Sequence, residues 1–252
     1  MNNPLLALTN VSITRGNKEV LSQINWSIFP QEHWVILGSN GCGKSTLLEI
    51  ASGYLWPTEG QVYLLEGKLG EVYLPDLRAK IGYVAAWVFA HLTDDIPVED
   101  VIASGTDASI GRMVDMSSSL KQKVNEQLEF FEISYLKGRL FGDLSSGEKL
   151  KLILARSLIN NPSILILDEP FAHLDISTRY HTYDLLNKLS KRANAPSIIL
   201  VTHYLEDICP FFTHALLLKQ GQIHASGLKN DILRPDLLSQ LFNIPLRTTP
   251  LA

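Results

Sequence analysis

A short glycine-rich stretch at residues 38–46 carries the clearest chemistry in the sequence. It reads Gly-Ser-Asn-Gly-Cys-Gly-Lys-Ser-Thr and fits the pattern G-x-x-x-x-G-K-[ST]. Glycines in this pattern let the backbone curl so that its N–H groups point at a phosphate, assisted by the positive end of a following helix. The lysine then supplies charge to the β- and γ-phosphates, and the next hydroxyl is placed to ligate Mg²⁺. We therefore expect a nucleotide-phosphate site.

Each residue of this loop is a candidate nucleotide ligand: Gly38, Ser39, Asn40, Gly41, Cys42, Gly43, Lys44, Ser45 and Thr46. Ser45 is also the candidate metal ligand, and Thr46 adds a hydroxyl toward the α-phosphate. If the Cys42 thiol is accessible, alkylation should block nucleotide binding and nucleotide should protect it. A buried Cys42 would instead be a small apolar filler.

A second candidate site follows the aliphatic run Ile164 to Leu167, which has the composition of a buried strand. Asp168 and Glu169 come directly after it, at the strand end where ligands bind in open α/β sheets. Asp168 would hold Mg²⁺ directly or through water, and Glu169 would orient or deprotonate an attacking water. The alternative is an acidic helix cap, which is less favoured because the phosphate loop is also present.

The third motif is Leu144-Ser145-Ser146-Gly147-Glu148, immediately before a helical pattern. In register with the other two motifs, it resembles the signature of the ATP-binding-cassette (ABC) ATPase family, which is usually LSGGQ. In that family, the signature of one subunit closes over the ATP held by the phosphate loop of another. Ser145 and the Gly147 backbone would form an anion site at a helix N-terminus.

The resemblance implies two further site residues. Asp175 matches the D-loop aspartate that couples the two nucleotide sites across the family's dimer, although Ala172 stands where a serine is common. His203 matches the switch histidine that contacts the γ-phosphate, and the alternative for it is an ordinary loop histidine. The resemblance therefore assigns Glu169 and His203 to catalysis.

Three departures from the family pattern bear on the chemistry. The family has a glutamine after a strand such as Ile81 to Val84, near Mg²⁺ and the lytic water, whereas Ala85-Ala86 follows here. Hydrolysis would then be slower, or it would be coupled to the membrane partner in a different way. Arg15 stands where the family stacks adenine on an aromatic, so it either stacks on the purine or stays a solvated turn residue. Glu148 adds negative charge, and we expect it to face the ribose rather than a phosphate.

The elements that position these motifs follow from hydrophobic periodicity. Residues 5–37 alternate β-like runs with turns, and the last run, Trp34 to Leu37, predicts a buried strand before the phosphate loop and a helix that stops at Gly53. Further short strands are predicted at Gln61 to Leu65 and Glu71 to Leu74. Between Val98 and Leu140 the period turns helical, clearest in the stripe of Leu120, Val124, Leu128 and Phe131.

A β/α pattern then resumes. The predicted elements are a helix at Gly147 to Ile159, strands at Ile164 to Leu167 and Ser197 to Val201, a helix at Thr178 to Arg192, a hairpin at 215–225 and a helix at Asp231 to Phe242. The fold class is therefore α/β, a P-loop nucleotide-hydrolase core of ABC type with an N-terminal antiparallel β subdomain and an inserted helical subdomain. We expect one domain over residues 1–252, divided at 1–86, 87–146 and 147–252.

Composition narrows the functional class. Lys and Arg number 22 against 26 Asp and Glu, which gives a net charge of −4. This charge provides no positive field to attract a phosphate backbone, so nucleic acid is not expected as a partner. The longest apolar stretch, Tyr83 to Ala90, has eight residues, whereas a spanning helix needs about 20. The N-terminus carries no secretory signal, and Cys42 and Cys209 provide no disulfide framework or zinc spacing. A cytoplasmic enzyme is expected.

The nearest resemblance is to single-cassette transporter ATP-binding subunits of the molybdate-transport-associated group, on Ile102 to Gly105, Ala108 to Gly111 and the missing glutamine. It implies a Mg²⁺-dependent ATPase that forms a head-to-tail homodimer around two ATP molecules and drives separate membrane permease subunits. Such a subunit is cytoplasmic or peripheral on the inner face of the cell membrane. The alternatives are a soluble ABC ATPase acting as a switch on a protein or nucleic acid, and an unrelated P-loop kinase or GTPase. The transported substrate cannot be inherited from the resemblance.

Overall fold

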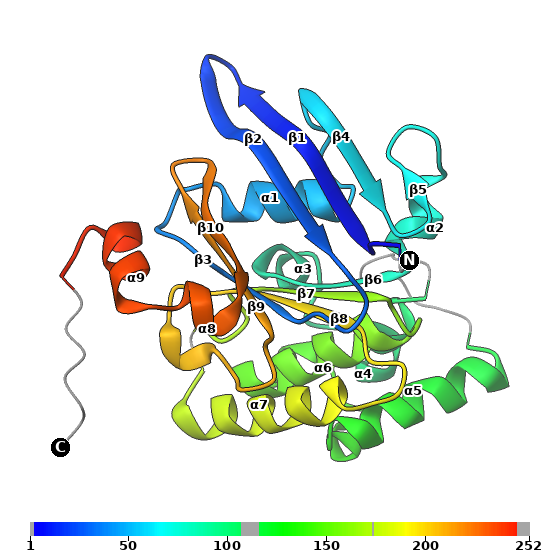
Figure 1. Cartoon of the computed structure of the whole chain (residues 1–252). Helices are drawn as coiled ribbons and strands as arrows, with labels where there is room; N and C mark the ends of the chain where they lie inside the picture. Colours follow the sequence, from blue (N-terminus) through cyan, green and yellow to red (C-terminus); the bar gives the residue numbers. More distant parts are fainter. Residues whose placement is uncertain (1–2, 107–115, 173, 246–252) are drawn as a thin grey trace, which may run out of the picture. The chain divides into compact units, whose positions relative to one another are not determined.

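The computed structural model describes residues 3–106, 116–172 and 174–245 (Figure 1). The chain divides into two compact units. Unit 1 combines Met1–Val72 with Ser197–Ala252, and unit 2 is Tyr73–Pro196. Both units contain strands and helices, which agrees with the predicted α/β class.

The N-terminal part of unit 1 is an antiparallel sheet in the order β2-β1-β4-β5 (Figure 1). Its strands are β1 (Leu6–Arg15), β2 (Lys18–Ile28), β4 (Glu59–Leu64) and β5 (Gly67–Lys68). Val62 and Leu64 on β4 are buried and Tyr63 between them is exposed, the alternation expected of a sheet with one wet face. This confirms the predicted antiparallel β region and the strand at Gln61 to Leu65.

Parallel strands form the second part of unit 1 and present the phosphate loop. Strand β3 (Trp34–Leu37) lies between β8 (Ser197–Val201) and β9 (His214–Lys219), and β10 (Gln222–Leu228) pairs antiparallel with β9. Every residue of β3 and β8 is buried, as expected for strands covered on both faces. Helix α1 (Lys44–Ala51) follows β3 after the glycine loop, so the predicted order of strand, loop and helix is confirmed.

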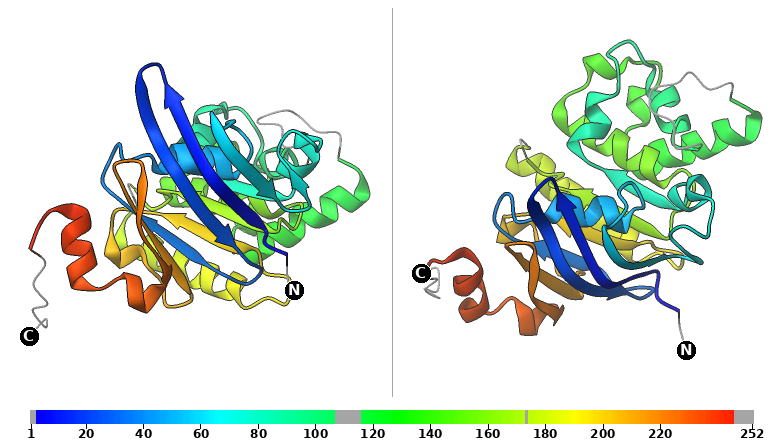
Figure 2. Two further views of the ribbon diagram at one scale, coloured as in Figure 1. Left: turned by 45° about the horizontal axis from the view of Figure 1, so that its top comes forward. Right: turned by 90° about the horizontal axis from the view of Figure 1, so that it is seen from above.

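Unit 2 contains a parallel strand pair and six α-helices among its described residues. Strands β6 (Ile81–Val84) and β7 (Ile164–Asp168) pair directly. The helices are α2 (Leu74–Arg78), α3 (Ala86–Ala90), α4 (Val98–Ala103), α5 (Ser118–Phe130), α6 (Ser146–Leu158) and α7 (Ile176–Ser190). Figure 2 shows α4, α5 and α6 in green, and they pack on one another. In the predicted stripe, Val124, Leu128 and Phe131 are buried and Leu120 is half-buried.

The Ile102 to Gly105 segment ends α4 at a tight contact with α6. The Arg156 side chain donates from Nε to the Ser104 hydroxyl at 3.2 Å, and both residues are buried. A Cβ atom at Gly105 would collide with the Arg156 carbonyl oxygen, so only glycine lets the two helices approach this closely. The Asn160 amide then donates to the Gly105 carbonyl at 3.0 Å. This part of the sequence resemblance is thus a helix-packing contact, and residues 108–111 lie outside the described residues.

Two predicted elements are wrong. The segment Glu71 to Leu74 is not a strand, because Glu71 ends a turn, Val72 lies in a bend and α2 begins at Leu74. Pro75 suits the first helical turn and cannot donate to a strand ladder. The apolar residues of the segment therefore do not indicate a strand.

The predicted helix at Asp231 to Phe242 is two helices, α8 (Lys229–Ile232) and α9 (Pro235–Phe242). Arg234 has φ −84° and ψ 149°, the extended conformation that a following proline imposes. The apolar pattern continues across the break, with Ile232, Leu238 and Leu241 buried.

The division into 1–86, 87–146 and 147–252 stays a prediction. Among the described residues, no helix has the length and apolar character that crossing a bilayer requires.

Candidate functional site

The phosphate loop in unit 1 is shaped by left-handed glycines. Gly41 has φ 77° and Gly43, at the start of α1, has φ 108°, conformations that residues with a Cβ rarely adopt. A Cβ at Gly43 would also lie 2.7 Å from the Leu21 side chain. Because Gly43 has no side chain, the first turn of α1 has no side-chain cap, and its N–H groups suit an anion.

The Lys44 side chain folds back onto the phosphate loop. Its side chain is buried, with the residue 6% exposed, and Nζ donates to the carbonyls of Gly38 at 2.9 Å and Ser39 at 3.3 Å. The ammonium therefore sits at the mouth of the curled backbone, where a β- or γ-phosphate would meet it. Ser45, which carries the hydroxyl predicted to ligate Mg²⁺, is exposed beside it, and Thr46 is buried. These residues fit the triphosphate and the metal.

Cys42 is a buried structural member of the loop. Burial raises the pKa of its thiol above the ordinary value, outweighing the nearby positive charge of Lys44, which lowers it. Its carbonyl accepts from the Gly221 N–H at 3.0 Å, and the Gly221 carbonyl accepts from the Ser22 N–H at 2.9 Å. The turn between β9 and β10 thus ties the loop to β2. Of the two predicted alternatives, the structure favours the apolar filler.

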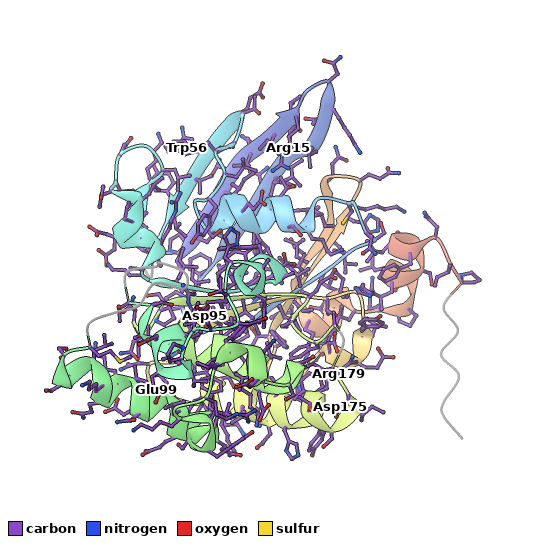
Figure 3. The ribbon with its side chains drawn as sticks, turned by 180° about the vertical axis from the view of Figure 1, so that it is seen from behind. Arg15, Trp56, Asp95, Glu99, Asp175 and Arg179 are labelled. Atoms are coloured by element: carbon purple, nitrogen blue, oxygen red, sulfur yellow. The ribbon has the colours of Figure 1, made fainter. Side chains whose placement is uncertain are left out.

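A hollow of about 280 Å³ lies beside this loop. It is lined by Lys18, Glu19, Val20, Ser39, Asn40, Gly41, Cys42, Gln220 and Gly221. Arg15 lies at the end of β1 (Figure 3). Its guanidinium pairs with Glu49 of α1 at 3.0 Å, and its side chain remains 56% exposed. Such an exposed ion pair contributes about 0–1 kcal/mol. Stacking of Arg15 on a purine stays a prediction.

His203 follows β8 on a segment that a buried carboxylate holds in place. Asp207, 2% exposed, accepts a hydrogen bond from the Thr202 hydroxyl, and the Thr202 oxygen accepts from the Tyr204 N–H at 3.1 Å. The His203 ring lies against the Tyr204 ring, with centroids 4.0 Å apart. Asp207 was missed by sequence reasoning, although an acid four residues after the histidine was a visible signal.

In unit 2, β7 delivers the two predicted carboxylates to a cavity of about 420 Å³. Its lining consists of Val84, Ala85, Ala86, Phe89, Ser146, Lys149, Leu150, Asp168, Glu169, Pro170, Ala172 and Leu174. Glu169 has φ 49°, a left-handed conformation that is uncommon for a residue with a side chain. Strain of this kind costs about 1–3 kcal/mol and clusters at functional sites. The alanines that replace the family's glutamine therefore share a cavity with the candidate base.

The signature and Asp175 stand at the starts of two helices, α6 and α7, and both contact Thr178. Asp175 stands directly before α7 (Figure 3). It caps the helix by accepting from the Thr178 N–H at 2.9 Å and from the Thr178 hydroxyl at 2.6 Å, and these bonds lower the pKa of Asp175. A Cβ at Gly147 would collide with the methyl group of Thr178. Ser145 caps α6, and Glu148 returns the contact. The signature thus packs against the first turn of the helix that Asp175 caps.

The predicted site residues fall in both units. Unit 1 holds residues 38–46 and His203, and unit 2 holds Ser145, Gly147, Asp168, Glu169 and Asp175. The family model described as ABC transporter matches residues 21–172, which includes the phosphate loop, the signature and both carboxylates. This chain belongs to the ABC transporter ATPase family.

The ATPase resembles curated proteins over nearly its whole length. A "Putative ABC transporter ATP-binding protein" of Streptococcus mutans is 34% identical over 96% of this chain and 93% of its own. The "Uncharacterized ABC transporter ATP-binding protein YlmA" of Bacillus subtilis is 37% identical over 96% of this chain and 92% of its own length. A "Zinc import ATP-binding protein ZnuC" of Rickettsia prowazekii is 28% identical over 92% and 90%. The resemblance to the molybdate-associated group stays a prediction.

Solved structures agree on fold and chemistry. The ATPase matches cbiO1 of Clostridium perfringens, described as part of the ABC transporter complex cbiONQ, with a TM-score of 0.80, 25% identity and coverage of 96% and 95%. It matches a dimeric cassette in a post-hydrolysis state bound to ADP and Pi with a TM-score of 0.76, 27% identity and coverage of 88% and 98%. The ATPase therefore binds and hydrolyses ATP, with Mg²⁺ as the metal of the family.

We expect both thiols of the native ATPase to resist alkylation. Cys42 is buried, and burial, with Asp207 nearby, raises the pKa of Cys209 to about 11. Iodoacetamide treatment followed by mass spectrometry should show both residues modified only after denaturation. Rapid labelling of native Cys42 that ATP prevents would contradict the filler assignment.

We expect Asp207→Ala to impair hydrolysis through His203. The change leaves the buried Thr202 hydroxyl without its acceptor, so the free energy of unfolding should fall by about 1–3 kcal/mol. It should also lower kcat more than it raises KM for ATP, because the histidine segment loses its anchor. Glu206→Ala, at the exposed neighbouring carboxylate, is the control and should change neither quantity. A D207A variant with wild-type kcat would refute the anchoring role.

Proposed function

We propose that two copies of the ATPase pair head to tail around two ATP molecules and drive separate membrane permease subunits. The chain carries one phosphate loop and one signature. The supporting observation is the apolar edge beside Asp175, where Ile176 is 88% exposed and Tyr180 is 72% exposed. Large apolar side chains left in water beside a nucleotide motif fit a surface that a second copy covers. The dimeric cassette bound to ADP and Pi supports the same arrangement.

Each of the two ATP sites in this pair would be built from residues of both copies, and these residues have different roles in hydrolysis. Ser45 and Asp168 would be ligands of Mg²⁺, which would offset the charge of the phosphates, and Lys44 and the loop N–H groups would bind the phosphates. Glu169 accepts a proton from the attacking water as its oxygen bonds to the γ-phosphorus, and the bond from that phosphorus to the bridging oxygen breaks to release ADP. His203 contacts the γ-phosphate. Ser145, Gly147 and Asp175 of the second copy close the site from the other side.

The pairing predicts that Glu169→Gln traps a closed dimer. Glutamine keeps the shape of the side chain but cannot accept the proton, so hydrolysis should fall by about 10²–10⁴-fold. Gel filtration with saturating ATP and Mg²⁺ should show the variant as a dimer, and without nucleotide as a monomer. Glu206→Gln, an exposed carboxylate, is the control and should keep wild-type hydrolysis. A monomeric E169Q protein under these conditions would rule out the pairing.

The transport role rests on relatives that are described as transporter ATP-binding proteins and on cbiO1, described as part of a transporter complex. Docking on a permease would place the ATPase at the inner face of the cell membrane. An affinity-tagged E169Q protein should therefore recover a multi-spanning protein from detergent-solubilised membranes. The transport role fails if every specific partner is soluble.

One observation favours a second candidate, a soluble ATPase that switches a protein or nucleic acid. In the family, the glutamine that relays to the membrane partner stands where Ala85-Ala86 is found, and these alanines line the cavity beside Glu169. Alanine has no side-chain amide, so neither residue can make the contact by which the family's glutamine relays to the membrane partner. A purely soluble set of captured partners would support this candidate and decide against transport.

A further inference from the structure

The Glu148 carboxylate is the centre of a hydrogen-bond cluster at the start of α6. Its Oε2 accepts from the Ser145 N–H and from the Ser145 hydroxyl, both at 2.8 Å. Its Oε1 accepts from the Tyr135 hydroxyl at 3.1 Å and lies 3.7 Å from the Arg139 guanidinium. In return, the Ser145 oxygen accepts from the Glu148 N–H at 3.3 Å, which completes a capping box. Donors from three residues therefore hold one carboxylate.

The cluster keeps this carboxylate ionised although its side chain is only 20% exposed. Burial acts to raise the pKa of Glu148, but the hydrogen bonds from Ser145 and Tyr135 and the charge of Arg139 outweigh it and lower the pKa. A full negative charge thus sits 2.8 Å from the Ser145 oxygen at neutral pH.

This contact fixes what Ser145 can offer a phosphate. A serine hydroxyl has one proton to donate, and here that proton points at Glu148. The lone pairs that remain would face the oxygens of a phosphate, and two acceptors repel. Ser145 can donate to the phosphate only after its proton turns away from the carboxylate. The proton stays on the serine oxygen, and only its acceptor changes.

We propose that Glu148 is a positioning residue that acts through Ser145 and raises the ATP concentration at which two copies close. In the separate subunit the carboxylate holds the serine proton, and closure on the ATP of a second copy requires the phosphate to take that hydrogen bond over. The inference rests on the proposed pairing. A neutral glutamine amide is a weaker acceptor than a carboxylate, so it should release the proton more readily.

The test compares E169Q with the E169Q/E148Q double variant. Analytical ultracentrifugation with increasing Mg-ATP gives the concentration for half-maximal dimer, which E148Q should lower about 5–10-fold, the difference between charge-assisted and neutral hydrogen bonds. With Glu169 intact, E148Q should lower KM for ATP and leave kcat within about twofold, as expected for an effect on binding. E169Q/E126Q is the matched control, because it removes the same charge from the exposed face of α5 and should leave the concentration unchanged.

Salt separates a contact from a long-range charge effect. Raising ionic strength from about 0.05 to 0.3 M screens distant charges but leaves a 2.8 Å hydrogen bond largely intact, so the ratio between the two proteins should persist. An unchanged or higher concentration for E169Q/E148Q would overturn the inference, as would a ratio that falls to one in high salt. If E169Q itself never dimerises, the proposed pairing fails instead.

Discussion

Backbone N–H groups at the first turns of helices must find acceptors, and the site depends on how two helices meet that need. At α1, a left-handed Gly43 contributes no side chain, so the N–H groups of the turn suit a phosphate. At α6, Ser145 and Glu148 cap the turn from within the chain. We infer that a nucleotide would complete the first of these turns, whereas the second is already capped and would have to rearrange to meet one. Before ATP binds, the first turn of α1 and the first turn of α6 therefore differ in whether their N–H groups already have a side-chain cap.

Sequence reasoning was reliable where one local pattern decides the structure. The phosphate loop was predictable because its glycines and lysine lie within nine consecutive residues and each has a separate physical requirement. Strand β7 and the helices α6 and α7 were predicted to within about two residues, since buried aliphatic runs and apolar stripes leave few alternatives. The antiparallel region followed from alternation in the same way.

The failures lie where a distant residue or a single proline decides. Pro75 turns an apolar segment into a helix start, and Pro235 divides an otherwise continuous amphipathic pattern. The contact of Tyr135 with Glu148 depends on where a loop folds back, which periodicity does not encode. Asp207 lies close to its partner Thr202 in the sequence, but the hydrophobic pattern does not mark a hydrogen bond between them. The sequence showed that Glu148 is unusual but not that Ser145 and Tyr135 hold its carboxylate, and its position toward the ribose stays a prediction.

The contact between Gly147 and Thr178 has a mechanical consequence. Because Gly147 has no side chain, the start of α6 packs directly against Thr178 in the first turn of α7, and Asp175 is hydrogen-bonded to the same threonine. We infer that a ligand which displaces the signature would also press on Thr178 and, through its hydrogen bonds, on Asp175. Coupling of this kind is reciprocal, since whatever moves Asp175 shifts the affinity of the signature by an equal free energy. The missing side chain of one glycine would thus allow a nucleotide at one site to report on the other.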